Sequence, residues 1–325
     1  MTEEVAIIAD SKGEGYSFAK GVYEFIKGKE GRDFPIKMID MERIDFKDGE
    51  FKLRVADNIR RSQCYLIHDS NKKPCEWYSE LNFALDAMAF SSPSEINVVL
   101  PYTKFARQDR KETSRVSVNA KALANMVSRY ADRGMTVDLH NPAMQAFFDI
   151  PFDNLYSFPS LINYLKKDYG GVLEKLVVVS PDVGGGKRVR GFAKRLKAAG
   201  IDADVAIGDK VRVQDNDVEK VEIMGSVRGK NCLIIDDIID TGNTLIKTGE
   251  AVRSLGAKSV YAYGTHGLFS DGADKFSIFD KVFVSDTLKN ANRKNIEVVS
   301  LVPLFGEAIY RTIRGESLSV LFDGN

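Results

Sequence analysis

The sequence predicts an α/β protein of two domains, each a mostly parallel sheet flanked by helices. Short apolar runs, such as residues 5–9 and 176–179, alternate with segments of helical periodicity, which is typical of sheets covered by helices on both faces. A length of 325 residues is enough for two ordinary cores. The alternation restarts after a polar crossing flanked by Pro151 and Pro159, so we place the domains at residues 1–156 and 157–325.

Composition narrows the class of protein. Basic and acidic side chains number 46 each, giving a formal net charge of +0, and this balance argues against an electrostatic nucleic-acid binder. No apolar run approaches a membrane span, and the acidic start, Met1-Thr-Glu-Glu, differs from the basic start of a secretory signal. Cys64 and Cys232 lie in apolar runs and are expected to be unreactive core residues. We therefore expect a cytoplasmic protein in a reducing compartment.

In the first half, residues 5–9 predict a strand and residues 16–26 a helix. Between them, Gly13 and Gly15 lack the third glycine of a dinucleotide-binding turn. A turn with two carboxylates and an aromatic ring follows at Phe46-Lys-Asp48-Gly49-Glu50. The other elements expected in this half are strands at residues 64–67, 96–100 and 135–140 and helices at residues 80–88 and 119–130.

Polar residues stand where two of these strands end. The basic and aromatic segment 101–111 follows one strand and contains Arg107 and Gln108. Arginine suits both a phosphate and the face of a base, although such a segment alone is more often a solvated loop. His140 closes the next strand beside Asp138. A lone histidine is usually structural, but this placement makes His140 a candidate for contact with a metal or phosphate.

The second half repeats the alternation of strands and helices. The strand at residues 176–179 ends in Ser-Pro-Asp182-Val-Gly-Gly-Gly-Lys-Arg188. The glycines suggest a phosphate-binding P-loop, but Pro181 and Arg188 stand where that motif requires glycine and Ser or Thr, so the motif fails. After a short strand at residues 205–207, the charged segment 209–217 is expected to be a mobile surface loop that closes on a substrate.

Residues 232–244 are the most informative stretch. A β-branched apolar run predicts a buried strand of a parallel sheet, and Asp236 and Asp237 stand at its end. The turn Asp240-Thr241-Gly242-Asn243-Thr244 then leads into a helical pattern over residues 245–255. Strand ends in open α/β sheets are ligand sites, and the free N–H groups at a helix start attract phosphate. The stretch therefore predicts a site for a phosphorylated polyol, with the acidic pair placed for hydroxyls or a metal.

Two other interpretations of this stretch are open. The spacing of Asp236, Asp237 and Asp240 fits the DDxxD pattern of isoprenoid synthases, but those enzymes are all-helical and usually carry a second acidic motif. Here a strand is predicted and no second DDxxD occurs. The acidic pair could also belong to a solvated turn after a core strand, which the attached phosphate-type turn disfavours.

Seven segments in one order carry a family resemblance. They are Phe46 to Glu50, Ala106-Arg107-Gln108-Asp109-Arg110, Asp138-Leu-His140, residues 147–154, 179–185 and 236–242, and Thr265-His-Gly-Leu-Phe-Ser270. With them, the chain resembles the ribose-phosphate pyrophosphokinases over nearly its whole length. The resemblance implies two phosphoribosyltransferase-like domains with ATP and ribose 5-phosphate between them. It also implies transfer of the diphosphoryl group of ATP to the 1-hydroxyl of ribose 5-phosphate, with AMP leaving.

The resemblance further implies a role for individual residues. Lys210 and Arg212 would be catalytic, and His140 and Asp182 would lie near Mg²⁺. ATP would be held by Phe46, Asp48, Gly49, Glu50, Arg107 and Gln108. Ribose 5-phosphate would be held by Asp236, Asp237, Asp240, Thr241, Gly242, Asn243 and Thr244. The family habit also implies a homo-oligomer built from dimers, commonly a hexamer.

The chain departs from the family pattern at several places, and its first thirty or so residues match poorly. Val211 separates the two catalytic candidates where a third basic residue is frequent, Asn243 replaces Gly or Ala, and residues 71–77 replace a polar loop with an Asn-Asp pair. Two other functions stay open. A type I phosphoribosyltransferase would explain residues 236–244 but needs no ATP segment. A non-catalytic regulatory relative of the synthetases is disfavoured because all the proposed catalytic and metal residues are present.

Overall fold

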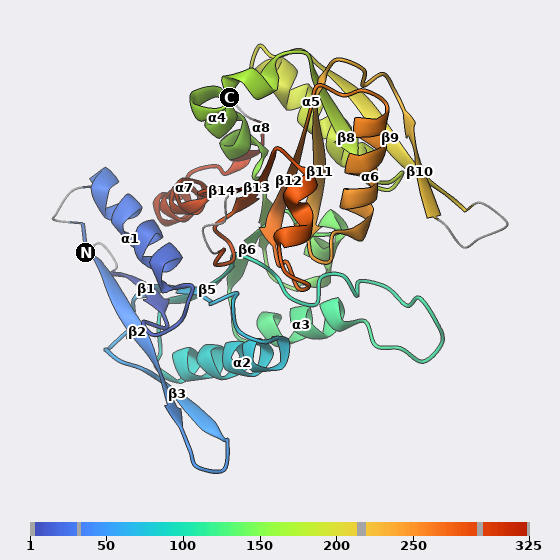
Figure 1. The fold of residues 1–325 in the computed structure, drawn as a ribbon. Helices are drawn as coiled ribbons and strands as arrows, with labels where there is room; N and C mark the ends of the chain where they lie inside the picture. Colours follow the sequence, from blue (N-terminus) through green and yellow to red (C-terminus); the bar gives the residue numbers. More distant parts are fainter. Residues whose placement is uncertain (1–3, 31–33, 213–218, 291–294, 324–325) are drawn as a thin grey trace. The chain divides into compact units, whose positions relative to one another are not determined.

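The computed structural model describes residues 4–30, 34–212, 219–290 and 295–323, which form two compact units (Figure 1). The first unit comprises residues 1–156, 287–289 and 302–318, and the second comprises residues 157–286, 290–301 and 319–325. The predicted boundary at residue 156 places residues 302–318 in the second domain. Instead, helix α7 (Val302–Arg314) packs beside α1 (Tyr16–Glu30) in the first unit, with the rings of Phe18 and Phe305 edge to face at 5.4 Å (Figure 1).

Each unit is built on a seven-stranded sheet, and the two sheets share one strand order. The first sheet runs β3-β2-β1-β4-β5-β6-β7, and the second runs β10-β9-β8-β11-β12-β13-β14. The pairs β2–β3 and β9–β10 are antiparallel and the other pairs are parallel. The predicted α/β class with mostly parallel sheets is therefore confirmed. Because the order is shared, β1 corresponds to β8 and β4 to β11.

The first sheet consists of β1 (Val5–Ala9), β2 (Ile36–Asp45), β3 (Phe51–Val55), β4 (Gln63–Ile67), β5 (Glu95–Leu100), β6 (Arg133–Val137) and β7 (Phe152–Leu155). The second consists of β8 (Leu176–Ser180), β9 (Ala203–Arg212), β10 (Glu219–Met224), β11 (Asn231–Ile239), β12 (Ser259–Gly267), β13 (Lys281–Ser285) and β14 (Ile296–Val299). The remaining helices are α2 (Pro74–Phe90), α3 (Asn119–Ser128), η1 (Pro142–Phe147), α4 (Phe158–Asp168), η2 (Gly170–Leu173), α5 (Gly186–Ala198), α6 (Asn243–Ser254), η3 (Asp274–Ile278) and α8 (Ser319–Asp323).

Buried apolar side chains fill the space between each sheet and its helices. In the first unit, alternate residues of β1, Ala6 and Ile8, join a cluster with Trp77 and Leu81 of α2 and Leu123 of α3. The second sheet has a cluster on each face, one shared with α4 and α5 and the other with α6 and η3. Removing this apolar surface from water stabilises the fold at roughly 25 cal/mol per Å². In this way the cores hold the carboxyl ends of the strands, and the loops that follow them, in place.

Several elements extend beyond their predicted bounds. Helix α2 begins at Pro74 rather than residue 80, since proline is well suited to the first helical position. Strand β11 continues through the acidic pair to Ile239, because β12 supplies partners for Ile238 and Ile239 beyond the pair. Strand β9 continues to Arg212 because β10 pairs with it antiparallel. The expectation of a loop from Asp209 was therefore wrong for residues 209–212, and residues 213–218 lie outside the described part of the chain.

Within the described ranges, none of the helices has both the length and the apolar character needed to cross a bilayer. Cys64 and Cys232 are buried and Cys75 is exposed. Burial raises the pKa of the Cys64 thiol to about 12 and that of Cys232 to about 11. Because the thiolate is the reactive form, these two side chains are the unreactive core residues that the sequence predicts.

Candidate functional site

The acidic pair lies on β11, near the edge of the second sheet at which the parallel strands end. Asp236 stands opposite Gly264 of β12. The side chain of Asp237 is 4% exposed and that of Asp236 is 31% exposed. The Asp237 backbone N–H donates to Asp236 Oδ1 at 2.9 Å, which fixes one carboxylate against the strand. The pair thus presents one partly exposed and one fully buried carboxylate at the ligand-binding edge of the sheet.

A turn and a helix start follow the acidic pair. Gly242 precedes α6 with φ of 68°, and a β-carbon there would overlap the ring of Phe276, so both backbone conformation and space require glycine. Asn243 and Thr244, predicted as part of the turn, are the first residues of α6. The first N–H groups of a helix have no intrahelical acceptor. They can therefore bind a phosphate in the field of the helix dipole.

The loop between β8 and α5 places Asp182 on the same edge of the second sheet. Ser180 Oγ donates to the Asp182 carbonyl at 2.5 Å, and the Gly185 N–H donates to Asp182 Oδ1 at 2.8 Å. A β-carbon at Gly185 would lie 2.5 Å from Ser180 Oγ, so the loop closes tightly only with glycine. Asp182 Oδ2 accepts no hydrogen bond from the described residues. This oxygen is left for a metal ion or a metal-bound water.

Arg188, on the first turns of α5, contacts both members of the acidic pair. Its Nη1 donates to Asp236 Oδ1 at 2.7 Å, and its Nη2 lies 2.8 Å from Asp237 Oδ1. In the sequence, Arg188 stands out only because it breaks the P-loop motif. A basic residue on the helix that follows a neighbouring strand was the available signal, but it does not show which carboxylates the side chain reaches.

Burial and the neighbouring Asp237 carboxylate raise the pKa of Asp236 to about 7, and the Arg188 guanidinium opposes this rise. Burial disfavours the charged form, and two adjacent carboxylates disfavour each other's ionisation. Near neutral pH, Asp236 can therefore both donate and accept a hydrogen bond. Hydroxyl groups of a sugar, which also do both, match this chemistry.

In the first unit, Phe46, Asp48, Gly49 and Glu50 form the loop that joins β2 to β3. The Phe46 N–H donates to the Glu50 carbonyl at 2.7 Å and the Gly49 N–H to the Phe46 carbonyl at 3.1 Å. Asp48 Oδ1 accepts from the Glu50 N–H at 3.1 Å. The Phe46 side chain is exposed by 47%. An exposed ring beside two carboxylates is available to a flat ligand.

The other predicted residues of the first unit follow β5 and β6. Arg107 and Gln108 are exposed, as is His140. Asn141 Nδ2 donates to Asp109 Oδ2 at 2.6 Å, and this bond ties the segment of Arg107 and Gln108 to the loop of His140. The structure therefore brings these three predicted residues to one edge of the first sheet.

Lys210 and Arg212 lie on the last residues of β9, opposite Val221 and Glu219 of β10. Their side chains are outside the described part of the structure. Within the described residues, no three His, Cys, Asp or Glu side chains group closely enough to form a complete metal site. A magnesium ion needs no such cage, because proteins usually bind it through one or two carboxylates together with substrate phosphates. Asp182, with its available oxygen, fits that requirement.

Comparison with known proteins identifies two matching domain families. Residues 18–130 match the N-terminal domain of ribose phosphate pyrophosphokinase, and residues 199–323 match the phosphoribosyl synthetase-associated domain. The ribose-phosphate pyrophosphokinase of Chlorobaculum tepidum is 41% identical over 292 residues, which cover 88% of each chain. That of Thermosipho africanus is 40% identical over 317 residues, covering 94% of this chain and 98% of the relative.

The fold has a similar solved counterpart. The crystal structure of phosphoribosylpyrophosphate synthetase from Mycobacterium smegmatis superimposes with a TM-score of 0.84 at 26% identity, covering 96% of this chain and 100% of that one. Both sequence and fold thus agree over almost the entire length. These likenesses confirm the resemblance carried by the seven sequence segments. The chain belongs to the ribose-phosphate pyrophosphokinase family, whose members are diphosphotransferases.

Proposed function

We propose that this chain transfers the diphosphoryl group of ATP to the 1-hydroxyl of ribose 5-phosphate, releasing AMP. The observation that carries the proposal is the edge of the second sheet, where an acidic pair, an arginine and a helix start lie together. Carboxylates suit ribose hydroxyls, and a helix start suits the 5-phosphate. We assign ribose 5-phosphate to Asp236, Asp237, Asp240, Thr241, Gly242, Asn243 and Thr244.

ATP is assigned to the loop of Phe46, Asp48, Gly49 and Glu50 and to Arg107 and Gln108. The exposed Phe46 ring offers an aromatic face to the adenine, while the adjacent carboxylates can accept from its amino group or from ribose hydroxyls. Arg107, beside the loop of His140, offers a guanidinium to the phosphates or the base. The segment is held in place by the Asp109–Asn141 hydrogen bond.

Phosphoryl-type transfer depends on positioning and charge neutralisation more than on covalent help. We propose that Asp182 and His140 are each placed to contact Mg²⁺, and bound Mg²⁺ would supply charge neutralisation at the phosphate oxygens. Lys210 and Arg212 would stabilise the charge that develops on the leaving AMP oxygen. The acidic pair would orient the ribose so that its 1-hydroxyl faces the β-phosphorus. We further propose a cytoplasmic homo-oligomer, built from dimers and possibly a hexamer.

The decisive experiment is AMP formation from ATP and Mg²⁺, measured with and without ribose 5-phosphate. We expect AMP to appear only when ribose 5-phosphate is present, in equal amount to phosphoribosyl diphosphate. The double variant Asp236→Asn/Asp237→Asn should bind ATP normally and form much less AMP. Absence of ribose-dependent AMP from the wild-type chain would favour a non-catalytic partner of active synthetases. Formation of a nucleotide from a base and phosphoribosyl diphosphate would favour a phosphoribosyltransferase instead.

A further inference from the structure

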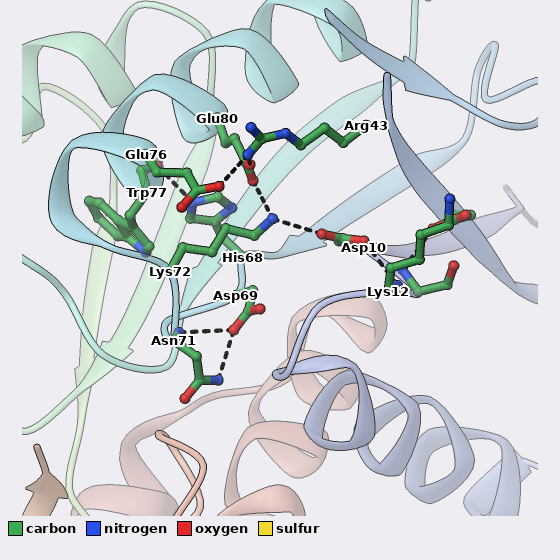
Figure 2. A network of polar contacts seen from close by, with 12 residues as sticks. Asp10, Lys12, Arg43, His68, Asp69, Asn71, Lys72, Glu76, Trp77 and Glu80 are labelled. Carbon is green, nitrogen blue, oxygen red and sulfur yellow. Dashed lines mark hydrogen bonds and ion pairs between the residues drawn. The ribbon is translucent and has the colours of Figure 1, made fainter. Parts of the chain in front are cut away.

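A chain of ion pairs crosses the first unit from the end of β1 to the end of β2 (Figure 2). Lys72 Nζ lies 2.7 Å from Asp10 Oδ2, at the end of β1, and 2.5 Å from Glu80 Oε2 on α2. The other carboxylate oxygen of Glu80 accepts from Arg43 Nη1 on β2. Each oxygen of Glu80 therefore holds a different cation, and Figure 2 shows its side chain between the two.

Glu80 is the buried centre of this chain. Its side chain is 4% exposed, while those of Arg43 and Lys72 are 25% and 12% exposed. Burial of this carboxylate is strongly unfavourable unless the carboxylate is paired and hydrogen-bonded. Pairing with both cations meets this cost, and the same contacts fix the position of each cation. Arg43 in particular is held by an anchor that belongs to the core of the unit.

Along β2, Arg43 is the last residue before the loop that pairs with a buried carboxylate. Residues 44–50, which include the loop assigned to ATP, are all exposed. Arg43 Nε donates to Asp45 Oδ1 at 2.7 Å, and its guanidinium also pairs with Glu76. The guanidinium carbon lies 4.4 Å from the centre of the Phe51 ring, on the other side of the loop. The Arg43 side chain thus contacts Asp45 before the loop, Phe51 after the loop, and helix α2.

Much of the anchor comes from the segment that departs from the family pattern. Residues 71–77 supply Lys72 and Glu76, and the single tryptophan, Trp77, which is completely buried beside His68. Burial lowers the pKa of His68 to about 4, so its imidazole is neutral and Nε2 donates to the Trp77 carbonyl at 2.9 Å. The start of α2 is therefore fixed to the end of β4. Arg43 is connected to this fixed start of α2 through Glu76 and Glu80.

We propose that Arg43 is a positioning residue for the ATP loop, held by Glu80 and Glu76 so that Phe46, Asp48 and Glu50 keep one orientation toward the nucleotide. This inference rests on the proposed function, since it assigns the loop to ATP. A purely structural role for the ion pairs would stabilise the unit without affecting one substrate more than the other. The two roles are distinguished by the substrate whose Michaelis constant changes and by the mobility of residues 44–50.

The test uses the full-length enzyme with Arg43→Met, Arg43→Lys and Glu80→Gln. Arg54→Met is the matched control, because Arg54 lies on β3 of the same hairpin with an exposed side chain and a single ion pair to Glu42 at 3.4 Å. Michaelis constants for ATP and ribose 5-phosphate are measured for each variant. Backbone hydrogen exchange of residues 44–50 reports on the loop without turnover. Fluorescence of Trp77 reports on the integrity of the first unit.

Arg43→Met should raise the Michaelis constant for ATP about tenfold, which corresponds to the loss of one charged hydrogen bond. The constant for ribose 5-phosphate and the Trp77 emission should stay near wild type, and residues 44–50 should exchange faster. Arg43→Lys should give a smaller change, because lysine keeps the charge but not the forked geometry. Glu80→Gln should resemble Arg43→Met. Arg54→Met should resemble the wild type in every measurement.

An unchanged Michaelis constant for ATP, together with unchanged hydrogen exchange of residues 44–50 in Arg43→Met, would overturn the inference. So would equal changes in Arg43→Met and Arg54→Met, or parallel losses for both substrates together with altered Trp77 emission. Should Arg43→Met fail to fold, Arg43→Lys carries the same comparison. A wild-type chain without ribose-dependent AMP formation would contradict the proposed function instead, while the exchange measurement would still show whether Arg43 holds the loop.

Discussion

The guanidinium of Arg188 bridges two adjacent carboxylates, with Nη1 2.7 Å from Asp236 Oδ1 and Nη2 2.8 Å from Asp237 Oδ1. Two neighbouring carboxylates repel each other, and an arginine within hydrogen-bond distance of both offsets this repulsion. The planar fork also fixes the direction of each carboxylate. The two aspartates assigned to ribose hydroxyls lie on β11 and are thus oriented by a side chain from helix α5.

We therefore predict that Arg188→Met raises the Michaelis constant for ribose 5-phosphate about tenfold, as expected for the loss of a charged hydrogen bond. Affinity for ATP, measured by titration, should be unchanged. Arg188→Lys should be intermediate, since it restores charge without the fork. Arg190→Met, an exposed neighbour on α5, is the control. Tighter binding of ribose 5-phosphate by Arg188→Met would mean that Arg188 blocks the site rather than orienting it.

Asp236 should make stability depend on pH. Burial, and after it the Asp237 carboxylate, raises the pKa of Asp236 to about 7, well above the ordinary value of an aspartate, so the folded chain binds this proton more tightly than the unfolded chain. The resulting stabilisation is complete below about pH 4 and is lost as pH rises through about 7. Asp236→Asn removes this dependence. As pH rises from about 4 to about 8, the thermal midpoint of the wild type should therefore fall relative to that of Asp236→Asn.

The same titration of Asp236 should affect binding of ribose 5-phosphate in the opposite sense, so that binding becomes tighter as pH rises. If the ionised Asp236 accepts from a ribose hydroxyl, the Michaelis constant for ribose 5-phosphate should rise as pH falls below about 7. Asp236→Asn should have a higher constant with a flatter pH profile. A variant profile parallel to that of the wild type would assign the titration to another group, such as the phosphate of the substrate.

Lys210 and Arg212 are predicted to act in the transition state. Interactions that form mainly there change turnover and leave substrate binding nearly intact. Lys210→Ala and Arg212→Ala should each lower turnover by on the order of a hundredfold to a thousandfold. ATP affinity, measured by direct titration, should change less than about tenfold. Val211→Ala, between the two, is the control. Near-normal turnover in both variants would leave the end of β9 without a catalytic role.

The family resemblance predicts an ATP site shared between subunits, with Phe46, Asp48 and Glu50 of one chain facing Arg107 of its neighbour. Phe46→Ala/Glu50→Ala protein and Arg107→Ala protein should each be inactive alone. Mixing them should restore part of the activity as subunits exchange, because mixed oligomers contain some intact sites. Mass spectrometry would verify the exchange. Verified exchange with no recovered activity would place each ATP site within one chain.

The sequence itself determined the class of fold and the chemistry at each strand end. Apolar runs of strand length alternating with helical periodicity predicted the parallel sheets, because such runs are buried on both faces. The acidic pair and the glycine turn were readable because they are local. Gly242, for example, has a positive φ of 68°, a conformation that glycine adopts without steric cost. The type of residue and its distance from a strand end were sufficient for these predictions.

Only the tertiary structure decided which separate segments meet. Arg188 is 48 residues from Asp236 in sequence, and α5 brings it to the acidic pair because β8 and β11 are neighbours in the sheet. Helix α7 joins the first unit because its apolar face packs on α1, and Arg43 is anchored to α2 by its ion pairs with Glu76 and Glu80. Local patterns fix periodicity and residue type, whereas sheet order and packing fix the partners of each side chain, and these depend on the whole chain.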